Sequence, residues 1–188
     1  LAGSCLFLIA LPWTDSPTTK VAFARYAAFG IVLLAMLIGF LDDRRHIPAT
    51  SRLFLGLALA ALLLLLIPDL ALKRIVLPSA NLVLETGSMA VPLTMICLLA
   101  LKNAVNMADG RNGLLLGMSL IWTLFFITHS APETIPGLYG LVGILMVLLV
   151  FNLRGRLFMG DCGAYGLATY FGIVALALHR NGTGSVRT

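Results

Sequence analysis

The stretch that decides the fold is MAVPLTMICLLALKNAVNMADGRNGLLLGMSLIWTLFFITHS, residues 89–130. It sets a polar segment, NAVNMADGRNG at residues 103–113, between two almost uninterrupted apolar runs. An α-helix needs roughly 20 mostly apolar residues to cross the hydrocarbon core of a bilayer, and each run is close to that length. Ionisable side chains at membrane depth are costly and are usually retained for function. The stretch therefore predicts two membrane-crossing helices joined by a functional polar loop.

The composition of the whole chain also indicates a membrane protein. Of its 188 residues, 60% are hydrophobic and 11% are charged, whereas an ordinary soluble domain has about 25% charged residues. The mean hydropathy is +1.00. The net charge of +5 suits an anionic partner or lipid surface. We expect the membrane as a partner and no nucleic acid.

Apolar runs of sufficient length predict about six to seven transmembrane helices. Residues 1–12 resemble the tail of one further span, and the complete expected spans are 21–41, 53–68, 89–108, 113–130, 136–152 and 164–178. The expected fold is therefore an all-α polytopic membrane protein with a single transmembrane domain over residues 1–188. The chain starts with Leu inside an apolar run, and we expect it to be truncated at both ends.

One connection differs from the apolar spans. Residues 69–88 alternate apolar and polar side chains around PSAN at residues 78–81. This alternation is typical of a short β-hairpin, and an ordered loop is the alternative.

Counting membrane crossings assigns the loops to two faces. Because each span switches sides, the loops on one face are 42–52, 103–113 and 153–163. The loop at 69–88, the loop at 131–136 and the C-terminal tail then lie on the other face. Lys and Arg residues divide almost equally between the faces, so the positive-inside rule does not orient the chain. Parity thus gathers four aspartates on one face: Asp42, Asp43, Asp109 and Asp161.

The first polar constellation lies in the 103–113 region. Lys102, Asn106 and Asp109 fall within roughly 60° of one another on a helix, and Asn103 lies beside them. A cation, amides and a carboxylate on one helix face suit a phosphorylated ligand. The structural alternative is a snorkelling lysine followed by a glycine-based helix cap.

The second constellation is GFLDDRRH at residues 39–46. The adjacent carboxylates of Asp42 and Asp43 can hold a divalent metal, or one can act as a base beside the other. The alternative is a solvated loop in which the aspartates pair weakly with the flanking arginines.

The third constellation is RGRLFMGDCGAYG at residues 154–166. Gly160 and Gly163 lie on either side of Asp161, so that backbone can approach a ligand closely there. Arg154 and Arg156 supply charge for phosphate. The alternative is a glycine-rich turn between two spans.

Carboxylates and cations on one membrane face suit phosphoryl transfer between anionic reactants, with a carboxylate-bound Mg²⁺ reducing the repulsion. A transporter or channel with interfacial carboxylates is the alternative from another class. That alternative predicts charges near the middle of the membrane, whereas all four aspartates fall at the ends of spans.

Three motifs, in this order and spacing, resemble the polyprenyl-phosphate N-acetylhexosamine-1-phosphate transferases: LDD at 41–43, NAVNMADGRNGLLLG at 103–117 and FMGDCG at 158–163. The resemblance covers nearly the whole chain. It implies transfer of a sugar-1-phosphate from a UDP-N-acetylhexosamine to polyprenyl phosphate, with release of UMP. It also implies Mg²⁺ as the cofactor, with Mn²⁺ as a substitute, and acidic loops on the cytoplasmic face of the inner (plasma) membrane. The sequence NMADG resembles the branch that uses UDP-GlcNAc.

Carried over residue by residue, the resemblance implies that Asp161 is the metal ligand. The catalytic residues that we expect are Asp42, Asp43 and Asp109. The substrate-binding residues that we expect are Lys102, Asn103, Asn106, Asn112 and Arg156.

The chain also departs from the family pattern. Asn112 stands where the family usually has a second Asp, and Ala164 where it often has Ser. A His-rich cytoplasmic loop that the family carries after a further span is absent from these residues. The chain is therefore expected to be either a fragment of a longer protein or a shortened relative that is inactive, such as a non-catalytic paralogue. The oligomeric state stays open, with a homodimer as one option.

The topology can be tested by cysteine labelling. We expect Arg45→Cys, Arg111→Cys and Gly155→Cys, each in a background without the three native cysteines, to share one accessibility. A membrane-impermeant maleimide should label all three in inverted vesicles and none in intact cells, with a cysteine in the 69–88 loop as the opposite-face control. Opposite behaviour of any one of the three would contradict both the span count and the shared site.

Overall fold

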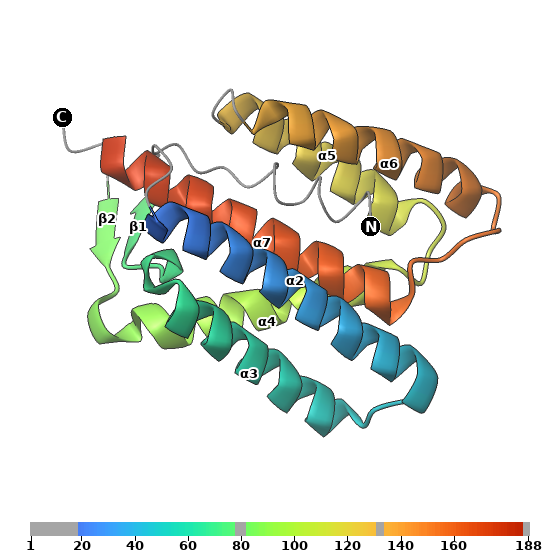
Figure 1. Cartoon of the computed structure of the whole chain (residues 1–188), viewed down its shortest axis with the longest axis horizontal. Helices are drawn as coiled ribbons and strands as arrows, with labels where there is room; N and C mark the ends of the chain where they lie inside the picture. Colours follow the sequence, from blue (N-terminus) through green and yellow to red (C-terminus); the bar gives the residue numbers. More distant parts are fainter. Residues whose placement is uncertain (1–18, 78–81, 131–133, 186–188) are drawn as a thin grey trace.

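The computed structural model describes residues 19–77, 82–130 and 134–185. These residues form a helical bundle with one small sheet at one end (Figure 1). The helices are α2 (Thr19–Arg45), α3 (Ala49–Leu66), α4 (Ala90–Ala108), α5 (Leu114–His129), α6 (Ile135–Leu153) and α7 (Gly160–Ser185). Within the described part of the chain, five helices are long and apolar enough to cross a membrane, and α5, with 16 residues, is shorter. The chain is thus an all-α polytopic membrane protein, as the sequence predicts, while the expected span at 1–12 lies outside the described residues.

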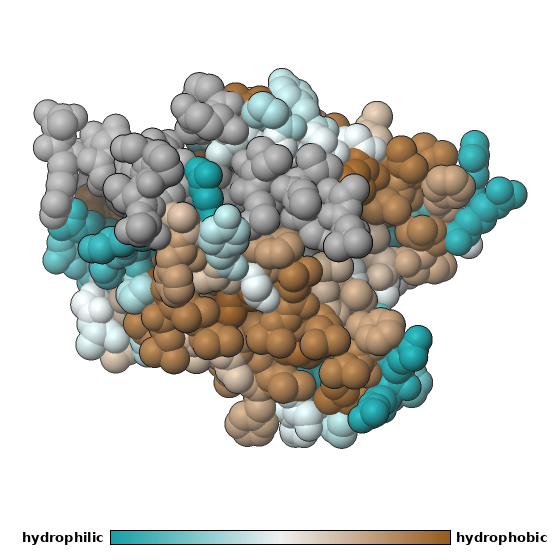
Figure 2. Space-filling view, in the orientation of Figure 1, coloured by the Kyte–Doolittle hydropathy of each residue, from teal (hydrophilic) through white to brown (hydrophobic). Residues whose placement is uncertain are grey.

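The distribution of apolar side chains fits a bilayer. Figure 2 shows apolar residues over the middle of the visible face and hydrophilic residues toward its two ends. Large exposed side chains include Phe54 on α3, Leu65 on α3 and Ile121 on α5. Lipid is as apolar as the protein core, so such helices need no polar outer face.

Helix α7 forms the core of the bundle. Its apolar window is 67% buried, whereas the other four candidate spans are 22–33% buried. Helices α2, α4 and α5 all contact α7, while α3 packs on α2 and α4, and α6 packs on α5 (Figure 1). Tyr170 and Phe171 are almost fully buried, and Trp122 of α5 meets the Phe171 ring edge-on at 5.4 Å between ring centroids.

The expected hairpin is present at one end of the bundle. Strand β1 (Arg74–Leu77) pairs antiparallel with β2 (Leu82–Glu85), and the turn between them lies outside the described residues. Short 3₁₀ helices, η1 (Pro68–Leu70) and η3 (Gly87–Met89), lead into and out of the sheet.

Two contacts fix this sheet to the bundle. The Leu72 amide donates to Oγ1 of Thr94 on α4 at 2.9 Å. Nε2 of His179 on α7 lies 2.6 Å from the carbonyl oxygen of Arg74. The 69–88 connection therefore lies at the C-terminal end of α7, whereas the three acidic loops meet at its other end, as crossing parity predicts.

Helices α2 and α7 approach each other very closely at Gly39. A Cβ atom at this position would overlap the carbonyl oxygen of Asp161 and lie 2.7 Å from Cα of Cys162. Both obstacles are backbone atoms, which cannot move aside as a flexible side chain can. The missing side chain of Gly39 therefore brings the end of α2 against the start of α7.

This close approach predicts that Gly39→Ala separates the two helices and lowers stability by about 1–3 kcal/mol or more. Gly30→Ala is the matched control, because Gly30 lies on the same helix with nothing within 4 Å of its would-be Cβ. That control should leave stability unchanged or raise it by about 0.5–1 kcal/mol, since alanine is the better helix former. Thermal unfolding in detergent measures both, and equal midpoints for the two variants would contradict the close contact.

Candidate active site at the start of helix α7

Two carboxylates hold the backbone amides at the start of α7. Asp43, at the end of α2, accepts hydrogen bonds from the amides of Asp161 at 2.9 Å and Cys162 at 3.0 Å. Asp109, which follows α4, accepts from the amides of Gly160 at 2.8 Å and Met159 at 3.3 Å. The start of α7 is therefore linked to the ends of two other helices.

The chemistry of a helix end explains this arrangement. The first amides of a helix have no partner within the helix, and the helix dipole favours negative charge near them. Gly160 allows the turn into α7, because its φ of +64° lies in the left-handed region. A Cβ at Gly160 would also lie 3.0 Å from an Asp43 carboxylate oxygen. Gly160 of the FMGDCG motif thus allows both the left-handed turn and the close approach of the Asp43 carboxylate.

Asp42 has surroundings quite different from those of its neighbour. Its side chain is 1% exposed, with Nε of Arg52 at 3.1 Å from Oδ2. The Tyr165 hydroxyl donates to the same oxygen at 2.7 Å, and the Ile47 amide donates to Oδ1 at 3.0 Å. Within the described ranges, neither aspartate forms an ion pair with Arg44 or Arg45; the Arg44 guanidinium lies instead over the Phe40 ring.

Lys102 is buried rather than snorkelling. It is 7% exposed, and its Nζ donates to the Arg52 carbonyl oxygen at 3.3 Å. The same Nζ lies 4.3 Å from the centroid of the Tyr165 ring. Gly56 on α3 leaves space for the ammonium, because a Cβ there would lie 3.3 Å from Nζ.

Asp161 is half-buried beside this group. The Asn106 side chain is near enough to interact favourably with its carboxylate, and Asp42 and Asp43 are near enough to interact with it electrostatically. In the part of the chain that the structure describes, Asp161 forms no salt bridge. Its carboxylate therefore retains capacity for further ligands.

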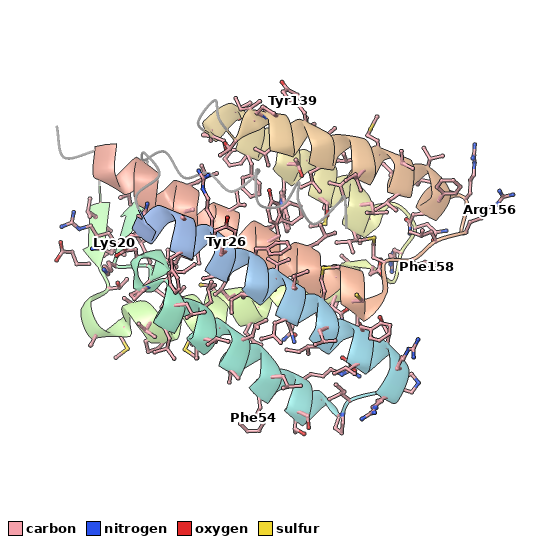
Figure 3. The ribbon with its side chains drawn as sticks, in the orientation of Figure 1. Lys20, Tyr26, Phe54, Tyr139, Arg156 and Phe158 are labelled. Atoms are coloured by element: carbon pink, nitrogen blue, oxygen red, sulfur yellow. The ribbon has the colours of Figure 1, made fainter. Side chains whose placement is uncertain are left out.

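The remaining predicted residues lie farther out. Asn103 and Asn112 are exposed, and Nδ2 of Asn112 faces Gly155. Arg156 is exposed at the outer tip of the connection between α6 and α7 (Figure 3). Across the described residues, no hydrogen bond or salt bridge joins these three side chains to the four aspartates.

One positioning residue was missed by the sequence analysis. Asn152 is 2% exposed, accepts a hydrogen bond from the Gly113 amide and donates to the Leu157 carbonyl at 2.7 Å. It thus ties the turn after α4 to the connection before α7. In the sequence, the indication of this role was a single asparagine near the end of the apolar run at 135–153.

Comparison with known proteins identifies the family. A sequence profile of Glycosyl transferase family 4 matches residues 26–179, which include nearly all of the helices that carry the site. The chain belongs to this family. The resemblance to polyprenyl-phosphate hexosamine-1-phosphate transferases is thereby confirmed.

Curated relatives in the family carry the name phospho-N-acetylmuramoyl-pentapeptide-transferase. The chain is 31% identical over 193 residues to the protein of Heliobacterium modesticaldum, covering 93% of this chain and 59% of the relative. It is 28% identical over 183 residues to that of Clostridioides difficile, covering 88% and 56%. The chain thus spans a little over half the length of these relatives.

The capping role of the two carboxylates can be tested by alanine substitution. Asp43→Ala and Asp109→Ala should each lower stability by about 0.5–2 kcal/mol, because each leaves two amides at the start of a helix without their acceptor. Asp69→Ala is the control, since Asp69 is 69% exposed and its two ion pairs are each 3.9 Å long. Thermal unfolding in detergent measures all three, and a loss no larger than that of the control would contradict the capping role.

Proposed function

We propose that this chain forms the acidic part of an active site that transfers N-acetylhexosamine-1-phosphate, with GlcNAc-1-phosphate as the first choice, from a UDP-sugar to polyprenyl phosphate. The reaction releases UMP at the cytoplasmic face of the inner membrane. The supporting observation is the meeting of three carboxylate-bearing helix ends at the start of α7, where Asp43 and Asp109 bind its amides. The chain spans part of its relatives' length, so the proposal concerns the protein at its natural full length.

The proposed reaction exchanges one phosphorus–oxygen bond for another. An oxygen of the polyprenyl phosphate bonds to the phosphorus that carries the sugar, and the bond from that phosphorus to the UMP oxygen breaks. Both reactants are anionic, so bringing them together is a large part of the barrier, and fixed cations lower it. Lys102 is the cation of the described site that lies deepest in the protein.

The donor set at Asp161 fits a hard divalent cation. Mg²⁺ is usually held by one or two carboxylates, with water and substrate phosphate oxygens completing its shell. Asp161 forms no salt bridge within the described residues, and the Asn106 amide lies beside its carboxylate. Among the described residues there is no group of three or more His, Cys, Asp and Glu side chains that could form an all-protein cage. Mg²⁺ or Mn²⁺ bound at Asp161 would supply positive charge to the diphosphate.

The two neighbouring aspartates receive different roles in this proposal. Asp43 is exposed near the C-terminal end of α2, at one end of an apolar span, and we assign the contact with the lipid phosphate to it. Asp42 is buried and bound to Arg52 and Tyr165, so that it acts on the site through these residues. We assign Asp109 and Asn106 to the nucleotide and diphosphate, with Asn103, Asn112 and Arg156, which are exposed, as outer contacts.

The choice of sugar separates two branches of the family. The NMADG sequence favours UDP-GlcNAc, whereas the relatives described above are named for phospho-N-acetylmuramoyl-pentapeptide transfer. Both donors present the same diphosphate, so the acidic site serves either. The donor must therefore be identified by direct competition.

The decisive assay uses the purified protein at its natural full length with polyprenyl phosphate. We expect lipid-linked product and UMP from UDP-GlcNAc, more slowly or not at all from UDP-N-acetylmuramoyl-pentapeptide, and no reaction without a divalent metal. Asp161→Asn should lower metal-dependent turnover by at least about 100-fold, because it removes the anionic ligand while keeping the shape of the side chain.

Asp69→Asn is the matched control, because Asp69 is an aspartate at the opposite end of the bundle that pairs with Lys73 and Arg180. It should retain wild-type turnover. Near-normal turnover of Asp161→Asn with an unchanged metal requirement would remove Asp161 from its role and leave Asp109 as the leading candidate. A preference for the muramoyl donor would reassign the substrate and leave the reaction type intact.

A further inference from the structure

Four residues form a closed ring of contacts beneath the candidate site: Asp42, Arg52, Lys102 and Tyr165. Arg52 pairs with the Asp42 carboxylate at 3.1 Å, and Tyr165 donates to the same carboxylate oxygen at 2.7 Å. Lys102 then closes the ring, with its Nζ 3.3 Å from the Arg52 carbonyl oxygen and 4.3 Å from the Tyr165 ring centroid. Tyr165 therefore contacts the anion through its hydroxyl and one of the cations through its ring.

The two charges on either side of Tyr165 do not touch. Lys102 interacts electrostatically with both Asp42 and Asp161, but throughout the described ranges no carboxylate lies within 4.0 Å of its Nζ. A buried ammonium and a buried carboxylate this near to each other would ordinarily pair, because a charge away from water is costly without a partner. The face of an aromatic ring compensates a cation in part without neutralising it.

The geometry of Tyr165 leaves its side chain little freedom. The residue is 2% exposed on the central helix α7, and Ala164 beside it is fully buried. Gly56 opens the space opposite, into which the Lys102 ammonium fits. The ring and hydroxyl are thus held between cation and carboxylate by the packing of α3, α4 and α7.

We propose that Tyr165 is a positioning residue that keeps Lys102 free of a carboxylate partner, and so available to the anionic donor, by occupying the Asp42 carboxylate that would otherwise pair with it. This inference rests on the proposed transferase function and adds a residue that does not itself touch the substrate. Coulomb attraction acts over several ångströms in a poorly solvated site. An unpaired Lys102, coupled to Asp161, therefore favours binding of the diphosphate at that carboxylate.

The test separates the hydroxyl from the ring. Tyr165→Phe keeps the aromatic face and frees Asp42 to pair with Lys102, so KM for UDP-GlcNAc should rise about tenfold while kcat changes less than about threefold. A purely structural hydroxyl would instead lower the unfolding midpoint and the active fraction, leaving KM unchanged. Tyr170→Phe is the control, because it removes a buried hydroxyl from the same helix about 7.5 Å farther along its axis. It should leave KM at the wild-type value.

A second pair of variants tests the cause with a binding measurement that needs no turnover. Asp42→Asn removes the carboxylate that could capture Lys102, so adding Tyr165→Phe to it should change the dissociation constant for UDP-GlcNAc less than about twofold. Tyr165→Phe alone should weaken that binding about tenfold. An equal weakening in both backgrounds would overturn the proposed role of Tyr165.

The outcomes distinguish the two proposals. Wild-type protein that neither binds nor turns over a UDP-sugar would overturn the transferase function and the role of Tyr165 within it. Wild-type protein that is active, with a Tyr165→Phe variant whose KM stays within about twofold of wild type, would overturn the role of Tyr165 alone.

Discussion

The start of α7 depends on hydrogen bonds from its free amides to two aspartates that belong to other helices. Asp43 brings in the end of α2, and Asp109 brings in the end of α4. The first amides of a helix have no partner within the helix and the helix dipole favours negative charge there, so these bonds position three helices at one point. Asp161 lies within the same turn, and its carboxylate is thereby placed among the other acidic groups without being used to hold the fold. The left-handed turn at Gly160 and the absent side chain of Gly39 make this meeting sterically feasible.

Asp42 and Asp43 make different contacts, and this difference is a second consequence of the geometry. On a helix, adjacent residues point about 100° apart, so Asp43 reaches α7 while Asp42 turns into the bundle. There Asp42 is compensated by Arg52 and Tyr165, as a buried carboxylate requires. Lys102 lies over the ring of the same tyrosine, with its Nζ 4.3 Å from the ring centroid. The candidate site therefore has buried charges, Asp42 and Lys102, beneath an exposed layer that includes Asp43.

Because lipid surrounds the helices, a small number of polar and close backbone contacts determines how the helices pack. Helices that are apolar all round gain little from turning one face inward, because lipid and protein core are equally apolar. Specific geometry must then come from close backbone approach and from polar groups that have no alternative partner. Both occur at the start of α7, and the hairpin contacts of Thr94 and His179 provide a counterpart at its other end. The family match over residues 26–179 takes in both sets of contacts.

The sequence by itself determined the class of the protein, because runs of apolar residues and their breaks follow directly from the thickness of a bilayer. It also grouped four aspartates on one face by parity, indicated the hairpin by alternation and indicated the family by three motifs.

Only the tertiary structure decided which contacts each of the four aspartates makes. Whether a carboxylate holds a helix end, pairs with Arg52 or stays open for a ligand depends on which helix lies against it. The contacts of these aspartates with α7 join residues about 50 to 123 positions apart, as between Asp109 and Gly160 or Asp42 and Tyr165, and local patterns contain no information about them. Lys102 is the clearest instance: the sequence predicted a cation for a phosphorylated ligand, with a snorkelling lysine as the alternative, and only the structure shows that Gly56 and Tyr165 enclose it.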